Sequence, residues 1–325
     1  MSGRVAGGLA AVVAGVLGVS VLSVLVGSRP IAPTALLDAT DPDHAVALTR
    51  WARTCLGLAV GAALGLAGAC MQGLTRNPLA DPGILGVNAG AAFAMVLAIS
   101  ALGVSDLASY VWFALAGAAA AMVLVHGVAA LGRGGATPVK LAVAGAAVTA
   151  ALTSWTSGVL LTDRATMETF RFWQVGTVGG RGFDVLLTGL PFLAAGAALA
   201  LAGTRLLDTL ALGDDLARGL GRRVARDRLV VGLACVLLAG GATALAGPVG
   251  FVGLVVPHAV RALVGSAHAR VLPLSLGVGA VLVVLADTVG RVVLPPTEVQ
   301  VGIMTAVVGG PVFMLLVRRG RLAAL

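Results

Sequence analysis

The residues best suited to chemistry outside a membrane are concentrated in residues 205–228. This stretch carries ten charged residues, whereas the chain of 325 has 22 basic and 14 acidic residues in all. Within it, Asp214 and Asp215 follow Gly213, where the positive end of a helix dipole would favour carboxylates. Leu212, Leu216 and Leu220 recur every four residues, and Gly221 is a natural helix stop. The pattern predicts a short amphipathic helix; the alternative is a solvated loop.

Three arginines near the ends of apolar stretches form a second candidate site. Arg50 and Arg53 are three residues apart, so they share one face of a helix start, and Arg291 closely follows Asp287. Surface arginines are usually solvated or in contact with lipid headgroups. Paired arginines that point outward also bind carboxylates well. We expect these three side chains at the surface, as docking points for an acidic partner.

Two polar side chains interrupt otherwise apolar sequence and are candidates to line a pathway. Gln72 and Asn88 flank a segment whose prolines, Pro78 and Pro82, and Gly83 force a chain break. A tight turn explains the prolines and the glycine, but it does not explain the polar side chains. Polar residues inside a membrane protein commonly mark a transport path.

Catalytic and metal-binding patterns are missing from the sequence. Residues 132–140, GRGGATPVK, have glycines and a lysine in the wrong order for a phosphate-binding loop. There is no Ser/His/Asp set, no HExxH and no cluster of metal ligands. The three cysteines, Cys55, Cys70 and Cys235, lie in apolar windows without a CxxC motif and are interpreted as free buried thiols. The sequence therefore predicts no catalytic residue, no metal site and no cofactor bound by this chain.

The elements that must position these residues are membrane-spanning helices. The chain is 58% hydrophobic with a mean hydropathy of +1.02 and 46 glycines. A span needs about 20 apolar residues, and hydrocarbon forces the backbone into helices that pack through small side chains. We predict an all-α bundle in one integral-membrane domain, residues 1–325, with about ten transmembrane helices. The expected spans are 5–26, 52–74, 84–103, 108–131, 139–161, 186–204, 229–247, 250–265, 271–289 and 299–317.

The distribution of basic residues predicts the orientation in the cell membrane. With a cytoplasmic N-terminus, 15 of the 22 basic residues fall on the cytoplasmic side and seven on the other. Both termini are then cytoplasmic, and the helix near 213–221 lies in the cytoplasm between spans six and seven. The net charge of +8 comes from residues at span ends, so it points to lipid and not to nucleic acid.

Six motifs in order resemble the FecCD-type permeases. These are the membrane subunits of type II ABC importers for ferric siderophores, haem and cobalamin. The similarity runs from about residue 45 to the C-terminus. The motifs are RWAR (50–53), GACMQGLTRNPLADPGILGVNAGA (68–91), LALGDDLARGLG (210–221), GPVGFVGLVVPHAVR (247–261), ADTVGR (286–291) and GxPVF (309–313). The family often has Arg-Leu-Pro-Arg where this chain has Trp51 and Ala52 between its arginines, so the proline of that motif is absent here while the spacing of the arginines is kept.

The resemblance implies partners and assigns roles. It implies a permease dimer, homomeric or heteromeric, two cytoplasmic ATPase subunits that use ATP and Mg²⁺, and an extracytoplasmic binding protein. The residues that match the family's ATPase-coupling helix are Gly213, Asp214, Asp215, Ala217, Leu220 and Gly221. Arg50, Arg53 and Arg291 match arginines that meet glutamates of the binding protein. Thr137 and Pro138 are candidate gate residues at the inner mouth.

The function expected from this resemblance is import of a metal chelate, a ferric siderophore first and haem or cobalamin as alternatives. A different class of protein, an ion-coupled secondary transporter, would instead use Asp287, His258 or Arg261. A membrane-embedded enzyme is a third possibility, which the lack of a catalytic constellation disfavours.

Overall fold

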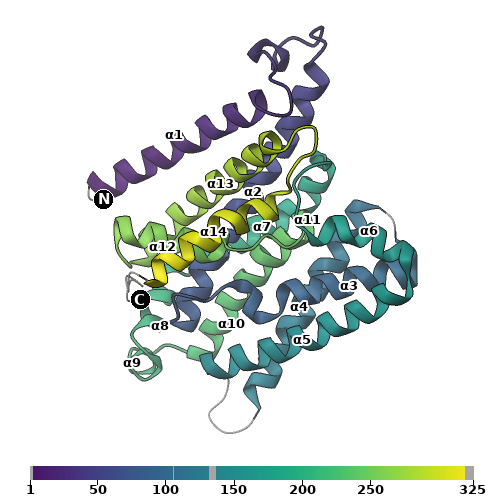
Figure 1. The fold of residues 1–325 in the computed structure, drawn as a ribbon. Helices are drawn as coiled ribbons and strands as arrows, with labels where there is room; N and C mark the ends of the chain where they lie inside the picture. Colours follow the sequence, from purple (N-terminus) through teal and green to yellow (C-terminus); the bar gives the residue numbers. More distant parts are fainter. Residues whose placement is uncertain (1–2, 105, 132–136, 319–325) are drawn as a thin grey trace.

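In the computed structural model, which describes residues 3–104, 106–131 and 137–318, every regular element is a helix (Figure 1). The predicted all-α fold is confirmed. The apolar helices are α1 (Gly3–Leu25), α2 (His44–Thr75), α3 (Val87–Leu102), α4 (Leu107–Ala130), α5 (Pro138–Thr162), α7 (Phe183–Ala202), α10 (Val224–Cys235) with its continuation η3 (Val236–Gly240) and α11 (Gly241–Ala246), α12 (Val252–Val264), α13 (His268–Val293) and α14 (Val301–Arg318).

Each of the ten expected spans coincides with one of these helices or, for 229–247, with the continuous run α10–η3–α11. Among the described residues, seven helices are long and apolar enough to cross a membrane. Three shorter apolar stretches, Val87–Leu102, Val252–Val264 and Val301–Leu315, account for the remaining expected spans.

Five short elements lie between the spans. They are η1 (Pro33–Leu36), η2 (Pro82–Leu85), α6 (Arg164–Gln174), α8 (Thr204–Ala211) and α9 (Asp214–Gly219). In α6 an apolar face carries Phe170 and Trp173 into the core, and Asp163 caps its first turn by accepting from the Ala165 and Thr166 amides. The helices α8 and α9 fill the charged stretch that separates α7 from α10 (Figure 1).

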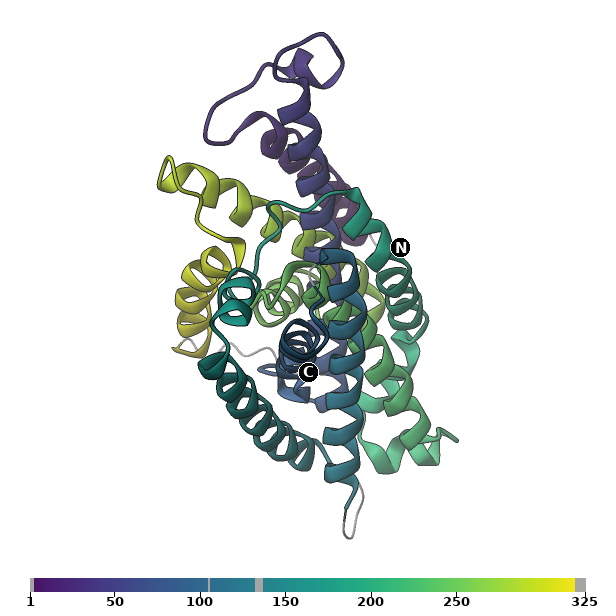
Figure 2. The same cartoon turned by 90° about the vertical axis from the view of Figure 1, so that its right-hand side faces the viewer.

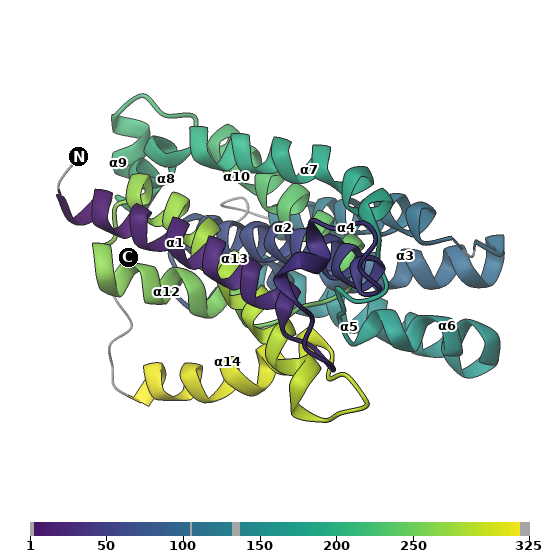
Figure 3. The ribbon, with the colours of Figure 1, turned by 90° about the horizontal axis from the view of Figure 1, so that it is seen from above.

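Helix α2 runs through the centre of the bundle, between α13, α12 and α7 (Figures 1 and 3). Glycines allow its backbone to touch its neighbours: a Cβ at Gly61 would overlap the carbonyl of Gly279 on α13. A Cβ at Gly68 would overlap the backbone of Gly253 on α12. Such close approach through small residues is how helices associate when the hydrophobic effect is absent. Glycines of this glycine-rich sequence therefore allow α2 to pack closely against α12 and α13.

The remaining spans form two groups beside this centre. Helices α3, α4 and α5 pack on one another, and the short helix α6 follows the end of α5 (Figure 2). Helix α14 lies at the other side of the bundle, against α13 and α12.

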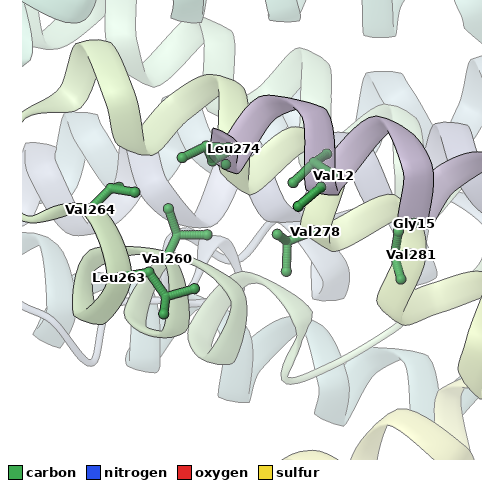
Figure 4. A pocket seen from close by; sticks show the side chains of 10 residues that line it. Val12, Gly15, Val260, Leu263, Val264, Leu274, Val278 and Val281 are labelled. Atoms are coloured by element: carbon green, nitrogen blue, oxygen red, sulfur yellow. The ribbon is translucent and has the colours of Figure 1, made fainter. Parts of the chain in front are cut away.

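Helix α1 packs along α13 and leaves an apolar groove beside α12. The groove has a volume of about 490 Å³, and Figure 4 shows the side chains from the three helices that line it. Val12 and Gly15 come from α1, Val260 and Leu263 from α12, and Leu274 and Val278 from α13. No charged residue lines this groove among those described.

Candidate functional site

The helix predicted at 213–221 is present as α9, and the local sequence sets both of its ends. Gly213 precedes it with φ 100°, a conformation that glycine adopts without strain. At the other end the Arg222 amide donates to the Ala217 carbonyl (3.0 Å) and the Gly221 amide donates to the Arg218 carbonyl (2.9 Å). Gly221 has φ 78°, so this is a Schellman cap with glycine in its left-handed position. The predicted stop at Gly221 is confirmed.

The apolar side chains of α9 point away from the rest of the protein. Leu216 within α9 is 62% exposed, and Leu212 and Leu220, which flank the helix, are 57% and 65% exposed, whereas Ala217 is buried. Figure 1 shows α9 at the edge of the molecule, beside α8. A stripe of leucines left in contact with solvent is the kind of surface that a protein partner covers.

One carboxylate of α9 fixes the helix to two spans. Asp214 accepts from Arg228 at the start of α10 (2.9 Å) and lies 3.5 Å from Arg76 at the end of α2. Arg76 is itself the left-handed residue that ends α2, with φ 51°. Asp215, by contrast, is fully exposed, and its ion-pair partner among the residues that the structure describes is Arg218 on the same helix (3.0 Å). The position of α9 is therefore coupled to the ends of α2 and α10.

Beyond Arg76 the helix ends and the chain forms a turn, as predicted. Asn77 and Asp81 each accept a hydrogen bond from the amide two residues ahead, at 3.0 Å and 2.8 Å, and η2 follows. Burial raises the pKa of Asp81 above its usual range. This turn lies between the two candidate pathway residues, Gln72 and Asn88.

Both of those residues are engaged in bonds between helices. Gln72 is fully buried; its amide donates to the carbonyls of Gly253 (3.2 Å) and Leu254 (3.3 Å), and its oxygen accepts from Arg261. The oxygen of Asn88 accepts from the Thr243 hydroxyl on α11 (2.8 Å). In this conformation Gln72 joins α2 to α12, and Asn88 joins α3 to α11. Their role in a pathway stays a prediction.

The two candidate gate residues begin α5. Thr137 is exposed and its hydroxyl accepts from the Lys140 amide (3.4 Å), which caps the helix, and Pro138 occupies the first helical position. Proline is well suited to that position because its missing N–H has no helical partner there. These contacts explain the helix start, and the gating role remains a prediction.

The expectation that Arg50 and Arg291 lie at the surface is wrong. Arg50 is only 8% exposed, and its guanidinium donates to the carbonyls of Val24 (3.0 Å) and Arg29 (2.7 Å). Arg291 is 2% exposed and donates to the carbonyl and hydroxyl of Ser23, at 2.8 Å and 2.7 Å. Both arginines bind the end of α1, and Arg50 also binds the loop after it, because a buried guanidinium must satisfy its donors within the protein.

Arg53 lies between these two and has carboxylate partners of its own. It pairs with the buried Asp287 (2.8 Å) and with the half-exposed Glu298 (2.6 Å). Asp287 also lies 3.3 Å from Arg291. Arg53 and Arg291 thus share one carboxylate, Asp287, whereas Arg50 bonds to backbone carbonyls, and Glu298 is the more exposed of the two acidic partners of Arg53.

Sequence reasoning did not include Glu298 or Arg181 in this region. Arg181 lies in the glycine-rich loop between α6 and α7, and Gly179 of the same loop contacts Arg53. Burial lowers the pKa of Arg181 to about 10. The glycines at 176, 179, 180 and 182 were the available signal, since they let this loop approach other backbone closely.

Comparisons with known proteins agree with this architecture. The model of the FecCD transport family matches residues 15–319. The ferric enterobactin transport system permease protein FepD of Escherichia coli is 43% identical over 98% of both chains. The probable siderophore transport system permease protein YfiZ of Bacillus subtilis is 42% identical over 83% of this chain and 81% of its own.

A solved structure extends the similarity to three dimensions. It belongs to a transporter assigned to the metal-chelate type of ABC transporters, in an inward-facing conformation. It superposes with a TM-score of 0.84 at 28% identity, covering 96% of this chain and 98% of the other. The family model spans nearly the whole sequence, so this multi-pass membrane protein belongs to the FecCD transport family.

Proposed function

We propose that this chain is the permease subunit of an ATP-driven importer that moves a ferric siderophore across the cell membrane. The relatives at 42–43% identity carry names of siderophore and ferric enterobactin permeases, which supports the cargo class. Haem and cobalamin remain the alternative cargoes of the same family.

The observation that carries the proposal is the outward leucine face of α9 on a chain whose sequence has no phosphate-binding loop. Leu212, Leu216 and Leu220 offer an apolar surface that a cytoplasmic ATPase would cover. Asp214 would pass the resulting displacement to α2 and α10 through Arg76 and Arg228. ATP and Mg²⁺ are then bound by that partner and not by this chain.

The surface of α5 supports a second permease subunit. Along this span Thr153, Ser154 and Ser157 are exposed, although hydroxyl groups are poorly solvated in hydrocarbon. The Ser154 hydroxyl donates to the Ala150 carbonyl (2.8 Å), so its oxygen can still accept a hydrogen bond from water. A polar stripe of this kind suits a water-lined path between two copies of the permease, or between this chain and a related one.

At the opposite end, an extracytoplasmic binding protein would deliver the cargo. Arg53 is the most accessible of the three arginines, and its exposed partner Glu298 could be exchanged for a carboxylate of the binding protein. Arg50 and Arg291 would stabilise this site from inside the protein. Both arginines bind the end of α1, and Arg291 also lies beside Asp287. Docking there and ATP binding below would together switch the path between outward and inward access.

An ion-coupled secondary transporter is less well supported by the geometry. Its candidate ion-binding carboxylate, Asp287, is already paired with Arg53 and Arg291. Its candidate Arg261 donates to Gln72 and is buried at the contact of α2 with α12.

The test is reconstitution of the chain into vesicles with an ATPase and a binding protein from the same genome. We expect uptake of the ferric siderophore only with all components and ATP present. Uptake driven by an ion gradient in vesicles that contain this chain alone would refute the proposal. A parallel series with haem and cobalamin distinguishes the cargoes.

A further inference from the structure

A basic hollow lies where α4 and α10 separate, at the end of the molecule that carries α9. Its volume is about 530 Å³. The charged and titratable side chains that line it are His126, Asp214, Arg218, Arg222, Arg223 and Arg228. It shares Arg222 and Arg223 with a second hollow of about 430 Å³, which Arg226 also lines.

The hollow exists because two spans diverge. A Cβ at Gly232 would overlap the end of the Met122 side chain, so α10 and α4 touch at this level. One and two turns nearer the end of α4 stand His126 and Ala130, and the facing wall of α10 includes Ala225 and Arg228. The small side chains of Ala130 and Ala225 leave room between the helices.

The charges that line the hollow are unbalanced. Arg222 pairs with Asp227 (2.8 Å), and Arg228 and Arg218 share Asp214, at 2.9 Å and 4.0 Å. Arg223 and Arg226 are exposed and have no hydrogen bond or ion pair with any residue that the structure describes. Two guanidinium groups, Arg223 in this hollow and Arg226 in the adjoining one, are therefore available to an anion beside three that already have partners.

An apolar surface leads from the hollow into the membrane. Leu229 and Leu233 of α10 are exposed directly beyond Arg226 and Arg228, and Val123 and Val128 of α4 are exposed near His126. A soluble anion would not contact such an apolar surface. A phospholipid would place its phosphate at the arginines and its acyl chains along these residues. The groove between α1 and α12 in Figure 4 has the apolar part alone, without any charged lining.

We propose that the arginine-lined hollow between α4, α9 and α10 binds the phosphate group of an anionic phospholipid from the inner leaflet. The lipid would connect Arg223 on α10 to Arg218 on α9 and so help to hold the coupling helix in place. The inference rests on the cytoplasmic placement of α9 given under the proposed function.

The test compares lipid retention by purified protein. The protein is equilibrated in mixed micelles with phosphatidylglycerol or phosphatidylcholine, and bound lipid is counted by native mass spectrometry. Arg223→Gln with Arg226→Gln removes the two arginines without partners. At about 1 kcal/mol for each arginine near a lipid surface, retention of phosphatidylglycerol should fall about 30-fold. Phosphatidylcholine should bind weakly to the parent protein and to the variant.

Two further variants locate the site. Arg205→Gln with Arg318→Gln removes the same charge from two exposed arginines that line neither hollow, and retention should stay near that of the parent. Ala130→Leu keeps every arginine but fills the hollow, and retention should fall. Thermal unfolding of each variant confirms that it is folded.

Three results would overturn the proposal. Equal loss in the control pair would show general surface attraction, and full retention by Ala130→Leu would place the lipid elsewhere. Binding of inorganic phosphate alone as tightly as phosphatidylglycerol would assign the hollow to a soluble phosphate compound. The assay contains no ATPase and no cargo, so its outcome is independent of whether the chain imports a siderophore.

Discussion

The arginine cluster around Asp287 and the helix α9 are the two places where this permease is expected to meet soluble proteins, and they are built in opposite ways. In the arginine cluster the functional groups are turned inward: Arg50 and Arg291 are almost completely buried and bonded to the chain's own oxygens. In α9 the apolar side chains are turned outward and nothing described in the chain covers them. The first region must exchange existing bonds to bind a partner, whereas the second has only to be covered.

The largest effect should come from removing a buried cation of the arginine cluster. In Arg291→Leu, the Ser23 hydroxyl and carbonyl lose their donor and Asp287 keeps only Arg53. Breaking a buried pair from one side costs about 3–5 kcal/mol. We expect a marked drop in the thermal unfolding temperature of the detergent-purified protein. Arg164→Leu, at an exposed arginine of α6, is the matched control and should change it little. If the two variants unfold alike, Arg291 is not the structural residue that its burial indicates.

For α9 we expect the opposite result: the stability of the permease changes little, and binding of the partner is lost. Leu216→Glu alters a side chain that is 62% exposed, so the stability of the permease should change by less than about 0.5 kcal/mol. An apolar anchor at the centre of an interface contributes about 2 kcal/mol or more, so ATPase affinity should fall about 30-fold. Affinity is measured by pull-down at graded ATPase concentrations, with Leu37→Glu in the exposed loop after η1 as a control for added charge. Retained ATPase binding would remove α9 from the interface.

The cap of α9 gives an intermediate effect. Gly221→Ala places a Cβ at φ 78°, where L-residues pay roughly 1–2 kcal/mol. The cost falls on the end of a short surface helix, so the expected result is faster amide hydrogen exchange at residues 217–222 with little change in overall unfolding. Gly219→Ala lies two residues earlier, at the last helical residue of α9 with open space around it, and should leave exchange unchanged or slower. Faster exchange in both variants would show that the cap geometry is not the cause.

The smallest effect tests whether bonds at the arginine cluster are exchanged. Glu298→Gln removes the exposed partner of Arg53 and leaves its buried partner, Asp287, in place. A half-exposed pair of this kind is worth about 0.2–1 kcal/mol, so binding-protein affinity should rise by up to about fivefold at low salt. Weaker binding in the variant would mean that Glu298 itself contacts the partner and does not compete with it.

Hydropathy and helix-end signals were sufficient to predict much of this structure. The ten spans follow from apolar length, and α9 follows from Gly213, its two aspartates and Gly221. The start of α10 was placed at residue 229, whereas the helix begins at Val224. Three charged residues, 226–228, precede the apolar run, and two of them are neutralised by partners: Asp227 by Arg222 and Arg228 by Asp214. Such pairing depends on the fold and leaves no periodic signal.

The inward direction of the arginines could not be predicted from the sequence for a related reason. Arg53 meets a carboxylate 234 residues away, and Arg291 meets Ser23 at a separation of 268 residues. The spacing of Arg50 and Arg53 indicates a shared helical face but does not say what that face contacts. Only Asp287 and Arg291, four residues apart on one helix, form a pair that the sequence itself suggests.

Helix α2 connects these two distant regions as one continuous rigid element. It is a single helix of 32 residues, about 48 Å long at 1.5 Å per residue. Near one end it carries Arg50 and Arg53, and at the other Arg76 reaches Asp214 of α9. Its glycines lock it against the backbones of α12 and α13, so it transmits tilt more readily than it bends. A tilt that begins when cargo arrives would reach the proposed ATPase contact through one side-chain link, the pair of Arg76 with Asp214.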